Sequence, residues 1–89
     1  MNYEEKSEII KSISHPVRLQ IIDALLNGSK CNVNEVAEKL NLHQSTLSQH
    51  LSILKSRGII RPKKDGVRTC YEIVDDRIIK IFNILNDDK

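Results

Sequence analysis

The chain has 89 residues and a formal net charge of only +2. This length allows one small domain over residues 1–89 and is too short to enclose a large substrate pocket. The small net charge does not by itself indicate a nucleic-acid partner. The two cysteines, Cys31 and Cys70, are too few for a disulfide framework and lack the Cys-x-x-Cys spacing of a structural zinc site, which favours a reduced, intracellular protein.

The sequence also lacks the features of a membrane or exported protein. No apolar run approaches the roughly 18 residues of a membrane span. The opening segment, Met1 to Lys6, has neither a basic leader nor an apolar stretch. We therefore expect a cytoplasmic protein with no membrane partner.

Two helices are predicted in the first third of the chain. Residues 3–13 place Ile9, Ile10 and Ile13 on one stripe, and this helix is expected to stop before Pro16, because a residue that precedes proline is pushed out of the helical region. Proline suits the first turn of a helix, so a second helix is predicted from Pro16 to about residue 27, with Gly28 as its C-terminal stop.

A short helix and a longer one follow, joined by a tight turn. Asn32 and Glu35 have the spacing of a capping box, which opens a two-turn helix. Residues 41–43 are long enough only for a tight turn, and we expect Leu42 to fill the angle between the flanking helices. The next helix is predicted over residues 44–56, and Gly58 is expected to end it. Its inward-facing residues are Leu47, Leu51 and Leu54.

A β-hairpin is predicted over residues 59–74, because Asp65-Gly66 between two β-prone runs is a strong hairpin signal. If these two residues form the loop, Arg61 faces Cys70 and Ile60 faces Tyr71. Cys70 would then lie on the polar side of its strand. The inner face would consist of Ile60, Tyr71 and Ile73.

The last helix, capped by Asp75 or Asp76, is apolar over more than one stripe. One small protomer cannot cover that much apolar surface, and a two-fold contact with a second copy is the simplest remedy. We therefore expect a homodimer that pairs through the first and last helices. The residues predicted at this interface are Ile9, Ile78, Ile81, Phe82 and Leu85.

These elements predict a mainly α fold with a β-hairpin wing: five helices and a two-stranded wing in the order ααααββα, a winged helix-turn-helix. The helix over residues 44–56 has the small polar side chains that can contact base edges in the major groove. The predicted contacts are Gln44, Ser45, Thr46, Ser48, Gln49 and His50.

The charge of the chain is unevenly distributed. Residues 55–68 contain six cations and one anion, so the rest of the chain has a net charge of −3. This basic segment directly follows the proposed recognition helix, where it is suited to DNA phosphates or the minor groove. The cations are Lys55, Arg57, Arg61, Lys63, Lys64 and Arg68. We therefore predict double-stranded DNA as the partner, with an imperfect palindrome facing the two copies of a dimer.

Four stretches of the sequence resemble the ArsR/SmtB family of bacterial winged-helix repressors. They are Ser14-His15-Pro16-Val17-Arg18-Leu19, Asn34-Glu35-Val36-Ala37, His43-Gln44-Ser45-Thr46-Leu47-Ser48-Gln49-His50-Leu51 and Leu54-Lys55-Ser56-Arg57-Gly58-Ile59-Ile60. The resemblance spans nearly the whole chain. It implies a dimer built from the first and last helices, repression of a nearby operon and release from DNA when an inducer binds. It also implies that His15 and His50 are scaffold residues.

The metal-binding patterns of that family are not present here. The position of its Cys-Val-Cys triplet is occupied by Asn32-Val33-Asn34, with Cys31 one place out of register. The ligand positions in the last helix of its zinc and nickel sensors correspond to Asp75-Asp76-Arg77, and no histidine follows His50. Soft metals need thiolates and zinc favours imidazole or thiolate, so we predict no metal site and no cofactor.

A third group in the family senses sulfide or oxidants through two cysteines. Cys31 roughly fits the first position and nothing fits the second. A redox or sulfur-based inducer that acts on Cys31 and Cys70 is one hypothesis, and a metal-responsive repressor with a non-standard site is an alternative. A winged helix that binds only another protein is a further alternative. An enzyme is not expected, because the chain has neither a phosphate-binding glycine loop nor a nucleophile and base pair.

Overall fold

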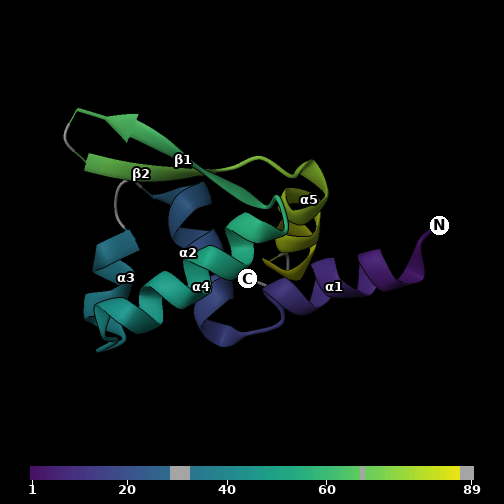
Figure 1. Ribbon diagram of the computed structural model, residues 1–89, viewed down its shortest axis with the longest axis horizontal. Coiled ribbons are helices and arrows are strands. Elements are labelled where there is room, and N and C mark those ends of the chain that lie inside the picture. The colour runs from purple at the N-terminus through teal and green to yellow at the C-terminus, as the bar shows by residue number, and fades with distance from the viewer. Residues whose placement is uncertain (29–32, 67, 87–89) are drawn as a thin grey trace.

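The computed structural model describes residues 1–28, 33–66 and 68–86, and for Asp65 and Arg68 it describes the backbone alone. Within these residues it contains five helices and one hairpin, which confirms the predicted winged helix-turn-helix (Figure 1). The elements are α1 (Tyr3–Ile13), α2 (Pro16–Asn27), α3 (Val33–Lys39), α4 (Gln44–Ser56), β1 (Ile60–Asp65), β2 (Arg68–Ile73) and α5 (Asp76–Leu85). None of the helices described is long and apolar enough to cross a membrane.

The helix boundaries follow from local chemistry. The α2 helix begins with Pro16, and the Nδ1 atom of His15 accepts a hydrogen bond from the backbone N–H of Val17. At the end of α4, Gly58 has a φ of +72°, the left-handed conformation that glycine adopts without steric cost. Asp75 caps α5 by accepting a hydrogen bond from the backbone N–H of Arg77. The bounds of α1, α2 and α4 agree with the prediction.

A tight turn joins α3 to α4, as predicted. Asn41 has a φ of +54°, a conformation that asparagine tolerates better than most residues. The backbone N–H of Leu42 then donates to the carbonyl of Ala37, and the Leu42 side chain packs against the core. The predicted cap at Asn32 lies outside the described residues.

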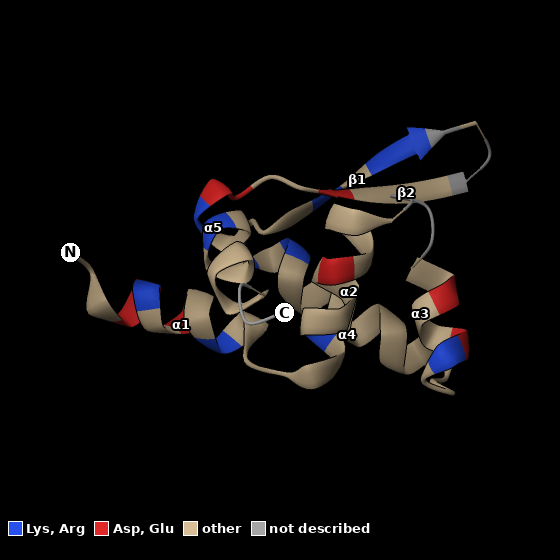
Figure 2. Ribbon diagram, turned by 180° about the vertical axis from the view of Figure 1, so that it is seen from behind, with Lys and Arg blue, Asp and Glu red and all other residues tan. Residues whose placement is uncertain are grey.

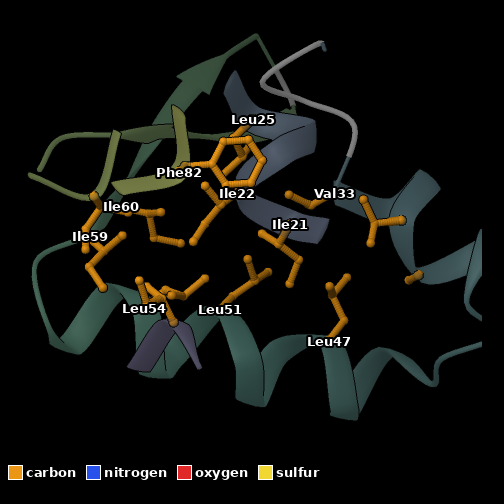
Figure 3. Packing of buried hydrophobic residues seen from close by; sticks show 14 residues of the cluster. Ile21, Ile22, Leu25, Val33, Leu47, Leu51, Leu54, Ile59, Ile60 and Phe82 are labelled. Carbon is orange, nitrogen blue, oxygen red and sulfur yellow. The ribbon is translucent and has the colours of Figure 1, made fainter. Parts of the chain in front are cut away.

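The core is centred on α2, whose Ile21 and Ile22 are fully buried. Figure 3 shows the leucines of α4 pointing toward these two isoleucines from one side, with Phe82 of α5 on the other. The start of the hairpin contributes Ile59 and Ile60, both of them buried. The recognition helix, the hairpin and α5 are thus held by one shared set of apolar contacts.

The hairpin register differs from the prediction by two residues. Arg61 pairs with Glu72 rather than Cys70, Ile60 pairs with Ile73, and Asp65 pairs with Arg68. Gly66 has a φ of +66°, whereas Asp65 stays in the strand. Because a positive φ is costly for residues other than glycine, the turn starts at Gly66 and not at Asp65. A shift of two residues leaves every side chain on its predicted face.

Candidate nucleic-acid interface

The α4 helix has one buried row and one exposed row. Leu47, Leu51 and Leu54 are buried in the core. On the far side of the helix, the polar side chains are exposed to solvent. This exposed row consists of Ser45, Ser48, Gln49, Ser52 and Ser56. Among the predicted base-contacting residues, Ser45, Ser48 and Gln49 therefore lie where a duplex could reach them.

The other predicted contacts on α4 are placed differently. The side chain of Gln44 is exposed, and its amide donates to Oδ1 of Asn34 on α3 over 3.4 Å. Thr46 is only partly exposed. His50 is also partly buried, and its Nδ1 accepts a hydrogen bond from Nε of Arg18 on α2 over 3.1 Å. His50 therefore faces α2, which fits the scaffold role implied by the family resemblance better than a base contact.

The hairpin lies beside the exposed row of α4. A shallow hollow between the two elements is lined by Ser48, Leu51, Ser52 and Lys55 from α4 and by Tyr71 from β2. The hairpin tip and the start of α4 also lie toward the same end of the molecule, whereas α1 extends toward the other end (Figure 1). A polar helix row and a hairpin thus form one continuous surface. Ser52 and Tyr71 were absent from the prediction, although Ser52 follows Ser48 by one helical turn.

Figure 2 marks the lysines and arginines in blue, and the six predicted cations differ in their ion pairing. Two of them form ion pairs: Arg61 with Glu72 across the hairpin, 2.6 Å between Nε and Oε1, and Arg57 with Glu8 of α1, 3.2 Å between Nη2 and Oε2. The lysines Lys55, Lys63 and Lys64 are exposed, and within the described residues they form no ion pair. Arg68 begins β2, and its side chain lies outside what is described.

Large apolar side chains are exposed on α1 and on α5. Those of Tyr3 and Ile10 on α1 and of Ile84 and Leu85 on α5 are 55% to 78% exposed. Of the predicted dimer residues, Leu85 is exposed, and Ile9 and Ile81 are partly buried. The prediction for Ile78 and Phe82 needs correction. Both side chains are at least 91% buried in the core of their own protomer, so they are not available to a partner. Ile10 and Ile84, which were not among the predicted dimer residues, are exposed.

The comparison with known families agrees with this geometry. The family model described as "Bacterial regulatory protein, arsR family" matches residues 15–61, which are slightly more than half of the chain. The chain belongs to the ArsR family.

Relatives that match along nearly the whole of this ArsR-family chain support the assignment. An uncharacterized HTH-type transcriptional regulator of Methanocaldococcus jannaschii is 41% identical over 86 residues, which are 96% of each protein. The crystal structure of the transcriptional repressor PagR of Bacillus anthracis is similar with a TM-score of 0.79 and 30% identity, covering 96% of this chain and 97% of that one. A third similar structure is the homodimeric winged helix-turn-helix DNA-binding domain Mb0332 of Mycobacterium bovis. Its TM-score is 0.78 and its sequence identity is 26%, and the match covers 94% of this chain and 77% of that one.

The cysteines of this ArsR-family chain require a second correction. Cys70 is 2% exposed, lies opposite Lys63 instead of Arg61, and is disulfide-bonded. Cys70 keeps its predicted strand face, but it is buried there and is not a reduced thiol in this structure. The other cysteine of the sequence, Cys31, lies outside the described residues.

The described residues contain no group of three or more His, Cys, Asp or Glu side chains that could hold a metal ion. His15 and His50 do lie together, with ring centroids 4.7 Å apart, but they have no carboxylate or thiolate partner among the contacts described. His15 and His50 thus connect the start of α2 with α4.

Proposed function

We propose that this ArsR-family protein is a sequence-specific DNA-binding repressor that acts as a homodimer on an imperfect palindrome. The observation that carries the proposal is the hollow between α4 and the hairpin, which joins Ser48 and Ser52 to Tyr71. One duplex can therefore contact the polar row of α4 and the hairpin lysines at the same time. The repressor names of relatives such as PagR support the direction of regulation.

The two parts of this surface have different tasks in the proposed complex. Gln49 and Ser48 are exposed and can hydrogen-bond to base edges in the major groove, and glutamine can pair with adenine through two bonds. Lys55, Lys63 and Lys64 approach phosphates, which supply affinity and register without sequence preference. Arg57 and Arg61 contribute less, because each is already paired with a carboxylate.

The dimer in this proposal forms through the exposed apolar side chains of α1 and α5. Ile84 is 73% exposed and Ile10 is 55% exposed, which leaves apolar area for a partner to cover. The homodimeric M. bovis domain of the same fold supports this state. A two-fold dimer presents two recognition helices about one DNA turn apart, so the preferred site contains inverted half-sites.

The test is selection of DNA sites from a random duplex library with the full-length protein. We expect selected sequences with two inverted half-sites whose centres are about 10 base pairs apart. Gln49→Ala should change the base preferred within each half-site, while Ser56→Ala, at the other end of the same row, should not. Failure to enrich any sequence, together with affinity that is insensitive to salt, would favour the alternative of a winged helix that binds only protein.

For the inducer, we propose thiol chemistry at Cys70 and Cys31. Cys70 supports this, because it lies directly opposite Lys63 on the neighbouring strand and is disulfide-bonded. Two thiols that form a disulfide lose two electrons and two protons to an oxidant of the peroxide or persulfide class. Oxidation at this position would therefore act on the hairpin that presents the phosphate-binding lysines.

Affinity for the selected duplex should differ between protein treated with dithiothreitol and protein treated with peroxide. Cys70→Ser should remove that difference. A Cys70→Ser protein that still responds to peroxide would overturn the thiol hypothesis. Release of the wild-type protein from DNA by Zn²⁺ or Cd²⁺ would favour the metal-responsive alternative instead.

A further inference from the structure

A polar cluster joins three helices on the side of α4 that faces away from the hairpin. Arg18 of α2 donates from Nε to Nδ1 of His50 over 3.1 Å, and from Nη1 to the carbonyl of Ser12 at the end of α1 over 3.3 Å. His15 adds its ring against that of His50, with centroids 4.7 Å apart. Arg18 therefore connects the middle of the recognition helix to the junction of α1 and α2.

This contact adds a polar anchor to the apolar packing of α4. Leu47, Leu51 and Leu54 form a single buried row, which sets the face that α4 turns toward the core. His50 contacts Arg18 of α2, and Tyr71 of the hairpin lines a hollow with Ser48 and Ser52 of α4. Because Gln49 precedes His50 directly, a rotation at His50 would move the side chain proposed to contact bases.

The Arg18 contact requires His50 to be neutral. An Nδ1 atom that accepts a hydrogen bond carries no proton, so the single ring proton of His50 is on Nε2. Protonation of Nδ1 would remove the acceptor and place a positive charge beside the guanidinium. The charged or titratable groups beside His50 are His15, which caps α2, and Arg18 of α2. Glu8 and Lys11 of α1 and Arg57 after α4 line a hollow on the other side of Arg18. Glu8 is shared between Lys11 and Arg57, so it does not offset a charge on His50.

We propose that Arg18 is a positioning residue for the recognition helix, that it acts through neutral His50, and that protonation of His50 weakens DNA binding. This inference depends on the proposed DNA-binding function. The chain would then release DNA in mildly acidic conditions without any ligand. The direction is opposite to the usual effect of acid on protein–DNA complexes, in which added positive charge strengthens attraction to phosphates.

Burial of the ring, followed by the nearby His15 and Arg18, lowers the pKa of His50 from its ordinary value of 6.5. The acid-sensitive range of the switch therefore lies below that value. Within it, the fraction of competent protein falls about tenfold for each pH unit per protomer, and apparent affinity falls with it.

The experiment measures binding of the selected duplex at pH values from about 8 to about 5.5, a range in which histidine is the main titrating side chain. We expect wild-type affinity to fall toward the acidic end of this range at constant salt, as His50 is protonated. His50→Asn places an amide oxygen near the position of Nδ1, so it keeps an acceptor that does not titrate, and its affinity should be nearly independent of pH. The matched control is His43→Asn, which replaces an exposed histidine at the start of α4 and should keep the wild-type slope.

Arg18→Lys keeps the charge but lacks the guanidinium fork that reaches two acceptors, so it should weaken binding at about pH 8 and flatten the pH slope. A second measurement needs no variant: nuclear magnetic resonance titration of the free wild-type protein should show the His50 ring and the backbone amides of Ser45 and Gln49 changing with one midpoint. A wild-type protein that binds no selected duplex at any pH would contradict the proposed function itself. Binding at about pH 8 with equal slopes for wild type and His50→Asn, or α4 amides that do not follow His50, would overturn the inference.

Discussion

Replacement of two hairpin lysines offers the sharpest test of how the proposed interface uses its charges. Lys63 and Lys64 are exposed and have no ion-pair partner among the described residues. Lys63→Ala with Lys64→Ala removes two cations from each protomer and four from a dimer. Each phosphate contact contributes about −0.9 to the slope of log affinity against log salt, so the double variant should flatten that slope by about 3.6.

This change is large enough to measure by fluorescence anisotropy. Between about 50 mM and about 200 mM salt, a difference of about 3.6 in slope means that the wild type loses roughly 150-fold more affinity than the variant. The loss should be similar on selected and random duplexes, because phosphate contacts have no sequence preference. Binding to the two kinds of duplex thus separates the lysines from Gln49.

The matched control removes the same number of charges from the same basic segment. Arg57→Gln with Arg61→Gln takes away two cations that are already paired with Glu8 and Glu72. An arginine held by a carboxylate does not neutralise a phosphate unless it first leaves its partner, so this control should flatten the slope by less than half as much. Equal flattening by the two double variants, or an unchanged slope in the lysine variant, would refute the division of the cations.

Three further predictions concern association and stability. Ile84→Asp places a charge on an exposed apolar position of α5 and should give monomers in sedimentation. The control Asn83→Asp, on the same helix, should leave the dimer intact. A dimer formed by the Ile84→Asp protein would contradict the proposed interface. Gly58→Ala should lower the free energy of unfolding by about 1–2 kcal/mol, because a φ of +72° is strained for alanine. The added methyl group itself would meet no atom within 4 Å, so the cost comes from the backbone alone. An unchanged urea midpoint would contradict this prediction. Asp75→Ala should cost about 1 kcal/mol through loss of the α5 cap. The hydrogen bond from Arg77 lowers the pKa of Asp75 in the folded protein. The stability difference between wild type and Asp75→Ala should therefore be complete above the ordinary pKa of 3.8 and vanish as the pH falls through the lower pKa of the folded state. A stability difference that persists in acid would contradict this cause.

The helices could be predicted because their ends have local chemical causes. Pro16 starts α2, Gly58 ends α4 and Asp75 caps α5, and each of these effects depends on residues only a few positions away. The hairpin was harder, because Asp65-Gly66 is compatible with a turn that starts at either residue. The strands settle at the position where Asp65 stays extended and Gly66 has the positive φ.

The candidate site could be predicted less completely, because its details depend on contacts between distant residues. Glu8 neutralises Arg57 although the two are 49 positions apart, and Arg18 engages His50 across 32 positions. Apolar residues occur on several sides of α5, so the sequence alone does not show that Phe82 faces inward and Ile84 outward. Charge and polarity predicted which segment matters, whereas tertiary packing decides which of its side chains are available.

The division of α4 into sides has a consequence for how such a regulator could acquire a new target. Substitution at a leucine of the buried row or at His50 would disturb the protein itself. Four exposed residues of α4 can change without such a disturbance, because they contribute nothing to the buried core: Ser45, Ser48, Gln49 and Ser52. Retargeting by laboratory evolution should therefore need randomisation at only these four positions, and most members of such a library should still fold.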